Sequence, residues 1–159
     1  MDLSNLGTFS AIVGAVVSVI FPGIASATAV GWVGQSAAGV VTEDPDKFGQ
    51  VLLLQALPGT QGIYGFLAAF MIMLRIGVFG QMQVLTLQQG IMFLLAALPI
   101  TIVGWKSALM QAKVSMAAVN IVVERPEEIG KALTFPAMVE TYAVLAFLAS
   151  LLMITRIPL

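Results

Sequence analysis

The chain has 159 residues, of which 59% are apolar and only 9% are charged, and its mean hydropathy is +1.01. Soluble domains carry roughly 25% charged residues, so this composition indicates a membrane protein. The net charge of −1 excludes a basic surface for nucleic acid, and the lack of His and Cys excludes disulfides, thiol catalysis and the usual zinc ligands. No positive segment precedes the first apolar run, so no cleaved signal peptide is expected.

Charged residues divide the chain into four apolar stretches, at about 3–41, 48–74, 84–123 and 132–155. Each exceeds the ~20 residues that a helix needs to span a bilayer, so we predict four transmembrane helices. The first and third stretches are too long for one bilayer, because 39 residues of helix reach about 58 Å against a hydrocarbon core of ~30 Å. They must either protrude or kink, and Pro22 and Pro99 are the candidate kinks.

The polar turns at 42–49 and 124–131 must lie on the same side of the membrane, because two spans separate them. The basic residues near that side are Lys47, Lys113, Arg125 and Lys131. Only Arg75 and Arg156 lie near the other side. This bias predicts that both turns are cytoplasmic and that both termini are outside.

The two halves of the chain resemble each other. Pro45 and Gly49 recur 81 residues later as Pro126 and Gly130, and Tyr64 recurs 78 residues later as Tyr142. Chance similarity between apolar helices is the alternative, but shared prolines and a shared tyrosine in one order favour duplication. We therefore predict an all-α membrane protein of two parallel helical hairpins, at 1–79 and 80–159, unlike the inverted repeats of many transporters.

A stripe of small residues accompanies the duplication. It lies at Gly23, Ala27 and Gly31 in the first hairpin, and at Gly104, Ala108 and Ala112 in the second. Small residues four apart let helices approach closely in lipid. The stripe fits either packing within one bundle or a tightly packed inner ring of helices.

One carboxylate lies inside the last apolar stretch. Glu140 is nine residues beyond Lys131, which is about 13 Å of helix, and sixteen before Arg156. An ionised residue at that depth costs roughly 2.5–3.5 kcal/mol, so it must be protonated, paired or bound to a cation. A purely structural carboxylic acid is the alternative. The repeat pairs Glu140 with Gly62, which predicts one ion for four helices.

Polar atoms gather midway along the second stretch. Thr60, Gln61 and Tyr64 share roughly one helical face, and Pro58 with Gly59 frees carbonyl oxygens there. Gln111 adds an amide deep in the third stretch. Hydroxyl, amide and carbonyl oxygens with one carboxylate suit a hard monovalent cation, although each group alone could serve as a helix–helix hydrogen bond.

The segments Leu-Pro-Gly-Thr-Gln-Gly-Ile-Tyr-Gly at 57–65 and Met-Val-Glu-Thr-Tyr-Ala at 138–143 resemble the rotor-ring proteolipid of V-type ATPases. The resemblance covers nearly the whole chain and is strongest to the duplicated four-helix form of bacterial sodium-translocating enzymes. It implies a closed ring of identical subunits in lipid, which turns against a static membrane subunit with a basic residue and contacts a central stalk at the cytoplasmic turns. It also implies a bacterial plasma membrane.

The resemblance further implies a set of site residues. The sodium ligands would be Leu57, Thr60, Gln61, Gln111 and Glu140, with Tyr64 hydrogen-bonded to the carboxylate. All six are present, so sodium is favoured as the transported ion, with the proton as competitor or alternative. The chain has no phosphate-binding loop, so ATP hydrolysis would fall to other subunits.

Two residues depart from the family pattern. Pro136 lies one turn before Glu140, and Lys106 places a charge inside the third stretch. If Lys106 approached Glu140, it would pair with the carboxylate and put sodium in doubt. Two rival functions are a small cation-coupled exporter, which would act as a dimer around an open cavity, and a structural or pore-forming bundle.

Overall fold

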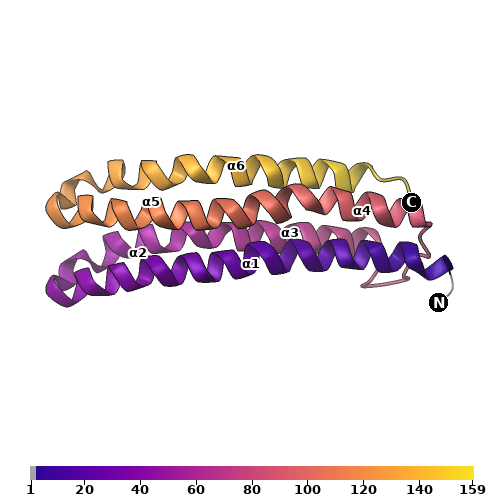
Figure 1. The fold of residues 1–159 in the computed structure, drawn as a ribbon, viewed down its shortest axis with the longest axis horizontal. Coiled ribbons are helices and arrows are strands. Elements are labelled where there is room, and N and C mark those ends of the chain that lie inside the picture. The colour runs from indigo at the N-terminus through magenta and orange to yellow at the C-terminus, as the bar shows by residue number, and fades with distance from the viewer. Residues whose placement is uncertain (1–2) are drawn as a thin grey trace.

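The computed structural model describes the backbone of residues 3–159 and the side chains from Asn5 onward, and within that range it contains no strand. The α-helices are α1 (Leu3–Glu43), α2 (Phe48–Ala56), α3 (Thr60–Arg75), α4 (Leu87–Pro99), α5 (Trp105–Glu124) and α6 (Ile129–Arg156). Short 3-10 turns at Pro45–Lys47, Leu57–Gly59 and Pro126–Glu128 and a π-helical turn at Ile100–Gly104 connect or continue them. Together they form four long helical rods, whose arrangement is drawn in Figure 1.

The four predicted transmembrane helices are confirmed as helices long and apolar enough to cross a membrane, at Asn5–Glu43, Pro45–Arg75, Leu87–Glu124 and Pro126–Arg156. The 41 residues of α1 reach about 61 Å at 1.5 Å per residue, roughly twice the ~30 Å hydrocarbon core. The long rods therefore extend beyond the hydrocarbon.

The two candidate kinks behave differently. α1 continues through Pro22 without a break, and the residue packed against the proline ring is small: a Cβ on Gly65 would lie 3.0 Å from the ring. Pro99 is followed directly by the π-helical turn. Proline lacks an N–H and so interrupts the i→i−4 hydrogen bonds of an α-helix, and a π turn accommodates that interruption. Pro22 thus lies within one helix, whereas Pro99 is the last residue of α4.

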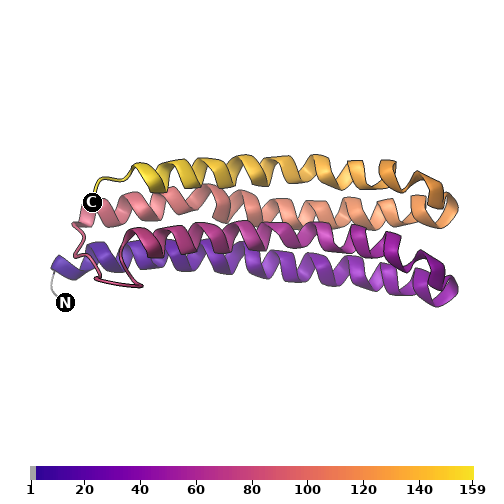
Figure 2. The same ribbon diagram turned by 180° about the vertical axis from the view of Figure 1, so that it is seen from behind.

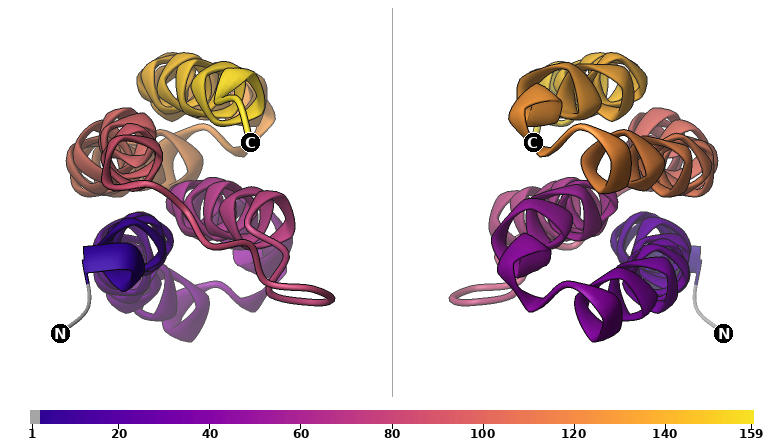
Figure 3. Two further views of the ribbon diagram at one scale, coloured as in Figure 1. Left: turned by 90° about the vertical axis from the view of Figure 1, so that its right-hand side faces the viewer. Right: turned by 90° about the vertical axis from the view of Figure 1, so that its left-hand side faces the viewer.

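The rods form two hairpins that lie side by side. Both hairpin turns lie at one end of the molecule, and both ends of the described chain lie with the 76–86 connection at the other (Figures 1 and 2). Viewed end-on, α1 lies next to the α4–α5 rod (Figure 3). Gly77, with φ of +78°, makes the reversal after α3, and a capping box at Thr86 begins α4.

The interior is built mainly from small side chains. Alanines such as Ala29, Ala68, Ala96 and Ala108 are fully buried, whereas large apolar residues such as Phe66 and Leu152 are more than half exposed. Burying alanine brings helix backbones close together, and large exposed apolar side chains suit contact with lipid or with other membrane-embedded helices. This close approach allows side chains from different helices to meet at one polar site.

Candidate ion-binding site

Glu140 lies near the middle of α6, eleven residues after the helix begins at Ile129. Its carboxylate is half-buried and receives two hydrogen bonds from other helices. Tyr64 of α3 donates its hydroxyl to Oε1 at 2.7 Å, and Gln111 of α5 donates Nε2 to Oε2 at 3.4 Å. The ring of Tyr64 also stacks on Phe147, two turns further along α6, with centroids 5.5 Å apart. Tyr64 therefore fixes the carboxylate to the first hairpin.

Two completely buried glutamines connect the helices behind the carboxylate. Gln111 donates to the carbonyl oxygen of Pro136 at 3.1 Å, and its own Oε1 accepts a hydrogen bond from Gln61 Nε2. A buried amide without partners costs about 1–3 kcal/mol, so these mutual bonds stabilise both side chains in one arrangement. The amides lie at the junction of α3, α5 and α6.

The 3-10 turn at Leu57–Gly59 completes the group. It interrupts the second rod at Pro58 and places the carbonyl oxygen of Leu57 within reach of the Thr60 hydroxyl, which donates to it at 2.9 Å. The same hydroxyl lies 3.4 Å from Gln61 Oε1. One continuous hydrogen-bonded chain thus runs from Leu57 to the carboxylate. It brings together all the predicted site residues: Leu57, Thr60, Gln61, Gln111, Glu140 and Tyr64.

Ser107 is a further member that the sequence did not single out as a site residue. It is almost fully buried, accepts a hydrogen bond from Gln61 Nε2 at 3.3 Å, and donates to the carbonyl oxygen of Val139 at 3.2 Å. Its repeat counterpart Ser26 accepts a hydrogen bond from the backbone N–H of Gly62 at 2.8 Å. The recurrence of this serine in both halves was the available signal.

The equivalent place in the first hairpin holds no acid. A Cβ on Gly62 would lie 3.2 Å from Ser26 Cβ, so the position is nearly filled. Between residues 3 and 159, no three acidic, His or Cys side chains cluster as a metal site would require. Any cation here would therefore depend on one carboxylate and neutral oxygens.

Lys106 does not approach the carboxylate. Its side chain is exposed, whereas Ser107 and Gln111 beside it on α5 are buried. In the part of the chain with described side chains, the ion pairs are Lys47–Asp44 and Lys131–Glu128. Glu140 is free of a basic partner within those residues, so the pairing with Lys106 that would have put sodium in doubt is not found.

A shallow groove of about 390 Å³ opens beside Glu140 on α6, lined by Ala137, Glu140, Thr141, Val144 and Leu145. All five residues come from α6, so the groove faces away from the other helices of the chain. The carboxylate can thus be reached from the surface of the bundle without passing through its core.

The comparisons with known proteins agree with this architecture. The family of the ATP synthase C subunit matches the chain twice, at 13–72 and 94–153. The V-type sodium ATPase subunit K of Enterococcus hirae is 45% identical over 150 residues, which cover 94% of this chain and 93% of that protein. The A-type ATP synthase subunit K of Methanocaldococcus jannaschii is 38% identical over 145 residues, covering 91% of this chain and 61% of that protein. The chain therefore belongs to the ATP synthase C-subunit family.

Proposed function

We propose that this chain is the rotor-ring subunit of a V-type rotary ATPase and carries sodium across the membrane on Glu140. The observation that carries this proposal is a series of close polar contacts that links Leu57, Thr60 and Gln61 through Gln111 to a single carboxylate in α6. Membership of the family and the sodium ATPase subunit among its relatives support it. ATP hydrolysis would be performed by other subunits. Each chain, with hairpins at 1–79 and 80–159, would carry one ion.

Sodium would neutralise the carboxylate and take oxygen ligands from the network. The Leu57 carbonyl, the Thr60 hydroxyl and the Gln61 amide oxygen already lie along one path. Gln111 now turns its amide nitrogen, not its oxygen, toward Glu140. Ligation by Gln111 therefore requires its amide to rotate, because two oxygens face each other favourably only with a cation between them. Ion binding would thus be coupled to a change in the buried hydrogen bonds.

The free-energy cost of placing an ionised carboxylate in lipid would determine when the ring can rotate. With sodium bound, Glu140 is neutral and can face hydrocarbon, whereas the ionised group would resist leaving a polar environment. A basic residue on a static membrane subunit, reaching the groove on α6, would compete for the carboxylate and release the ion. The turns at 42–49 and 124–131 would contact a central stalk on the cytoplasmic side of a bacterial plasma membrane.

Sodium and protons compete for the same carboxylate in this scheme, and carbodiimide labelling measures the competition because the reagent attacks the protonated acid. Sodium should protect Glu140 in the purified assembly. Above the sodium dissociation constant, each tenfold rise in sodium should lower the pH of half-maximal labelling by about one unit, because a bound cation makes protonation harder. Potassium at equal ionic strength is the control. Labelling that ignores sodium at every pH would exclude sodium carriage.

Proton carriage is the second candidate, and one observation favours it. The carboxylate already has two hydrogen-bond donors, Tyr64 and Gln111, without a cation. Such an acid could be held in place for protonation alone. The same labelling experiment distinguishes the two, because proton carriage predicts a midpoint that depends on pH and not on sodium.

Replacing Tyr64 with phenylalanine should weaken sodium binding by about tenfold or more. The change removes the 2.7 Å hydrogen bond to Glu140 but keeps the ring that stacks on Phe147, and a hydrogen bond to a charged group contributes about 1.5–3 kcal/mol. Isotopic sodium binding to the purified assembly measures the loss. Tyr142→Phe is the matched control, since Tyr142 is the repeat counterpart and is 67% exposed. Equal losses in both variants would contradict the assigned role.

A further inference from the structure

The amide of Gln61 is held in one orientation by two acceptors on α5. Its Nε2 donates to Gln111 Oε1 and to Ser107 Oγ, the second at 3.3 Å. An amide nitrogen carries two hydrogens, so these two bonds use both of them. With the nitrogen bonded to α5, the oxygen of the same amide lies on the side of Thr60, 3.4 Å from its hydroxyl.

That amide oxygen is poorly supplied with donors. Among the described residues its hydrogen-bond donor is the Thr60 hydroxyl, whose single hydrogen has a shorter contact, 2.9 Å, to the carbonyl oxygen of Leu57. Gln61 is completely buried, where an acceptor without a good donor is unfavourable. A turned amide would place its nitrogen beside the Thr60 oxygen instead. The two bonds of the nitrogen therefore oppose a turn that the oxygen alone would favour.

Ser107 differs from Gln111 because it can only accept from Gln61. Its own hydrogen is directed to the carbonyl oxygen of Val139, at 3.2 Å. If Gln61 turned, its oxygen would face the Ser107 oxygen with no hydrogen between them, which is repulsive. Gln111 has an amide that can itself turn, and ligation of sodium by its oxygen requires that turn. Ser107 is thus the acceptor for Gln61 that does not depend on the ion.

The repeat counterpart of Ser107 has a different kind of partner. Ser26 is equally buried, with both serines 6% exposed, but it accepts from the backbone N–H of Gly62 at 2.8 Å. A backbone N–H in a helix has one direction, so Ser26 joins α1 to α3 without selecting between two orientations of a side chain. Only the serine of the second half contacts an amide that has two possible orientations.

We propose that Ser107 is a positioning residue that keeps the Gln61 oxygen directed at the ion while the Gln111 amide turns. It acts through Gln61 and does not itself ligate sodium. Without it, the Gln61 amide would be free to turn together with that of Gln111, and the site would lose an oxygen ligand. Protonation of Glu140 needs no oxygen from Gln61, so Ser107 favours sodium over protons. The inference rests on the sodium carriage proposed above and adds the residue that selects the ligand orientation.

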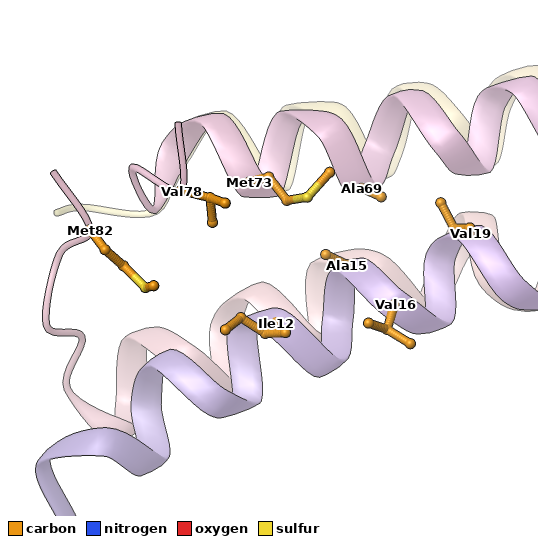
Figure 4. Close-up of a pocket in the computed structure, with 8 residues that line it drawn as sticks. All are labelled: Ile12, Ala15, Val16, Val19, Ala69, Met73, Val78 and Met82. Carbon is orange, nitrogen blue, oxygen red and sulfur yellow. The ribbon is translucent and has the colours of Figure 1, made fainter. Parts of the chain in front are cut away.

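The groove between α1 and α3 has no comparable polar arrangement (Figure 4). It measures about 310 Å³, and the residues that line it, such as Ile12, Ala69 and Met73, have apolar side chains. These side chains offer no oxygen to a hard cation. Sodium protection of Glu140 is therefore the readout for the test, because it reports on the polar site directly.

A double-mutant cycle tests this role, with sodium affinity measured as protection of Glu140 from carbodiimide in the purified assembly. Ser107→Ala should weaken sodium affinity by about tenfold, as expected for the loss of a buried hydrogen bond. In a Gln61→Ala background the same change should alter sodium affinity by about twofold or less, because Ser107 acts through Gln61. The pH of half-maximal labelling without sodium should be the same in Ser107→Ala as in the parent.

Ser150→Ala is the matched control for this cycle. Ser150 is also fully buried and accepts an N–H from another helical rod, that of Ile100 at 3.2 Å, but it lies ten residues beyond Glu140 on α6. This variant should bind sodium as the parent does, and native mass checks that all variants assemble. An equal loss from Ser107→Ala in both backgrounds, or no loss in the parent background, would overturn the positioning role and leave sodium carriage intact. A parent assembly that sodium does not protect would instead overturn the proposed function, and this inference with it.

Discussion

Glu140→Gln should abolish sodium binding by the assembled protein, with a loss of about a thousandfold in affinity. The variant keeps the size and the hydrogen-bonding capacity of the side chain but removes the only carboxylate inside the membrane-spanning part of α6. Two unit charges 4 Å apart attract by about 4 kcal/mol at an effective dielectric constant of 20, and each 1.4 kcal/mol is tenfold in affinity. Isotopic sodium binding would measure the loss, and carbodiimide incorporation should disappear together with it.

Glu124→Gln is the control for this experiment. Glu124 ends α5 at the exposed turn, so its replacement removes one carboxylate from the chain without touching the network. It should bind sodium as the parent does. Sodium binding that survives in Glu140→Gln, with the assembly intact, would show that the ion is held elsewhere.

Gln111→Ala should lower sodium affinity by about 10- to 100-fold and change sodium-free carbodiimide labelling much less. Gln111 is fully buried and contacts Gln61, Glu140 and the carbonyl oxygen of Pro136. Truncation removes one oxygen ligand and leaves buried groups unpaired, which costs about 1–3 kcal/mol. Proton uptake by the carboxylate needs no oxygen from this residue. Gln111→Ala should therefore reduce the protection by sodium much more than it changes the rate of labelling without sodium.

The counterpart of Gln111 in the first hairpin is Val30, so Val30→Ala provides a matched truncation outside the network. It should leave sodium protection unchanged. If Gln111→Ala reduced the labelling rate and the sodium protection equally, Gln111 would act only by supporting the fold. Circular dichroism and native mass on both variants would separate a folding defect from a ligand defect.

The four helices and their turns could be predicted from the sequence, because charges are excluded from most of the hydrocarbon and gather at its edges. The effect of each proline could not be predicted in the same way. Pro22 lies in continuous α1, with its ring packed against Gly65 and Gly104, which are distant in the sequence. Pro99 is instead followed by a π turn. The spacing of prolines along the sequence does not distinguish these two outcomes.

The residues of the candidate site also differ in how well the sequence predicts them. An isolated intramembrane glutamate and a cluster of polar residues are conspicuous in an apolar chain, so Glu140, Gln61 and Gln111 could be identified from residue type. Residue type alone did not identify Ser107, because serine is common in packed membrane helices, and its recurrence in both halves was the only signal. The carbonyl oxygen of Pro136 has no sequence signature. The direction of the Gln111 amide likewise follows only from its partners. Whether these groups ligate sodium stays a prediction.

The filled position at Gly62 has a consequence for energy conversion. A fixed number of ATP molecules is consumed in each turn of a rotary machine, and that free energy is divided among the ions moved in the turn. A ring in which every hairpin carried an acid would move two ions per chain. With Ser26 packed against Gly62 in place of an acid, the proposed function would move one. Halving the ions per turn doubles the free energy available for each. Moving one charge against 100 mV requires about 2.3 kcal/mol. A chain with one carboxylate instead of two would therefore be able to pump each ion against a steeper gradient for the same ATP consumption.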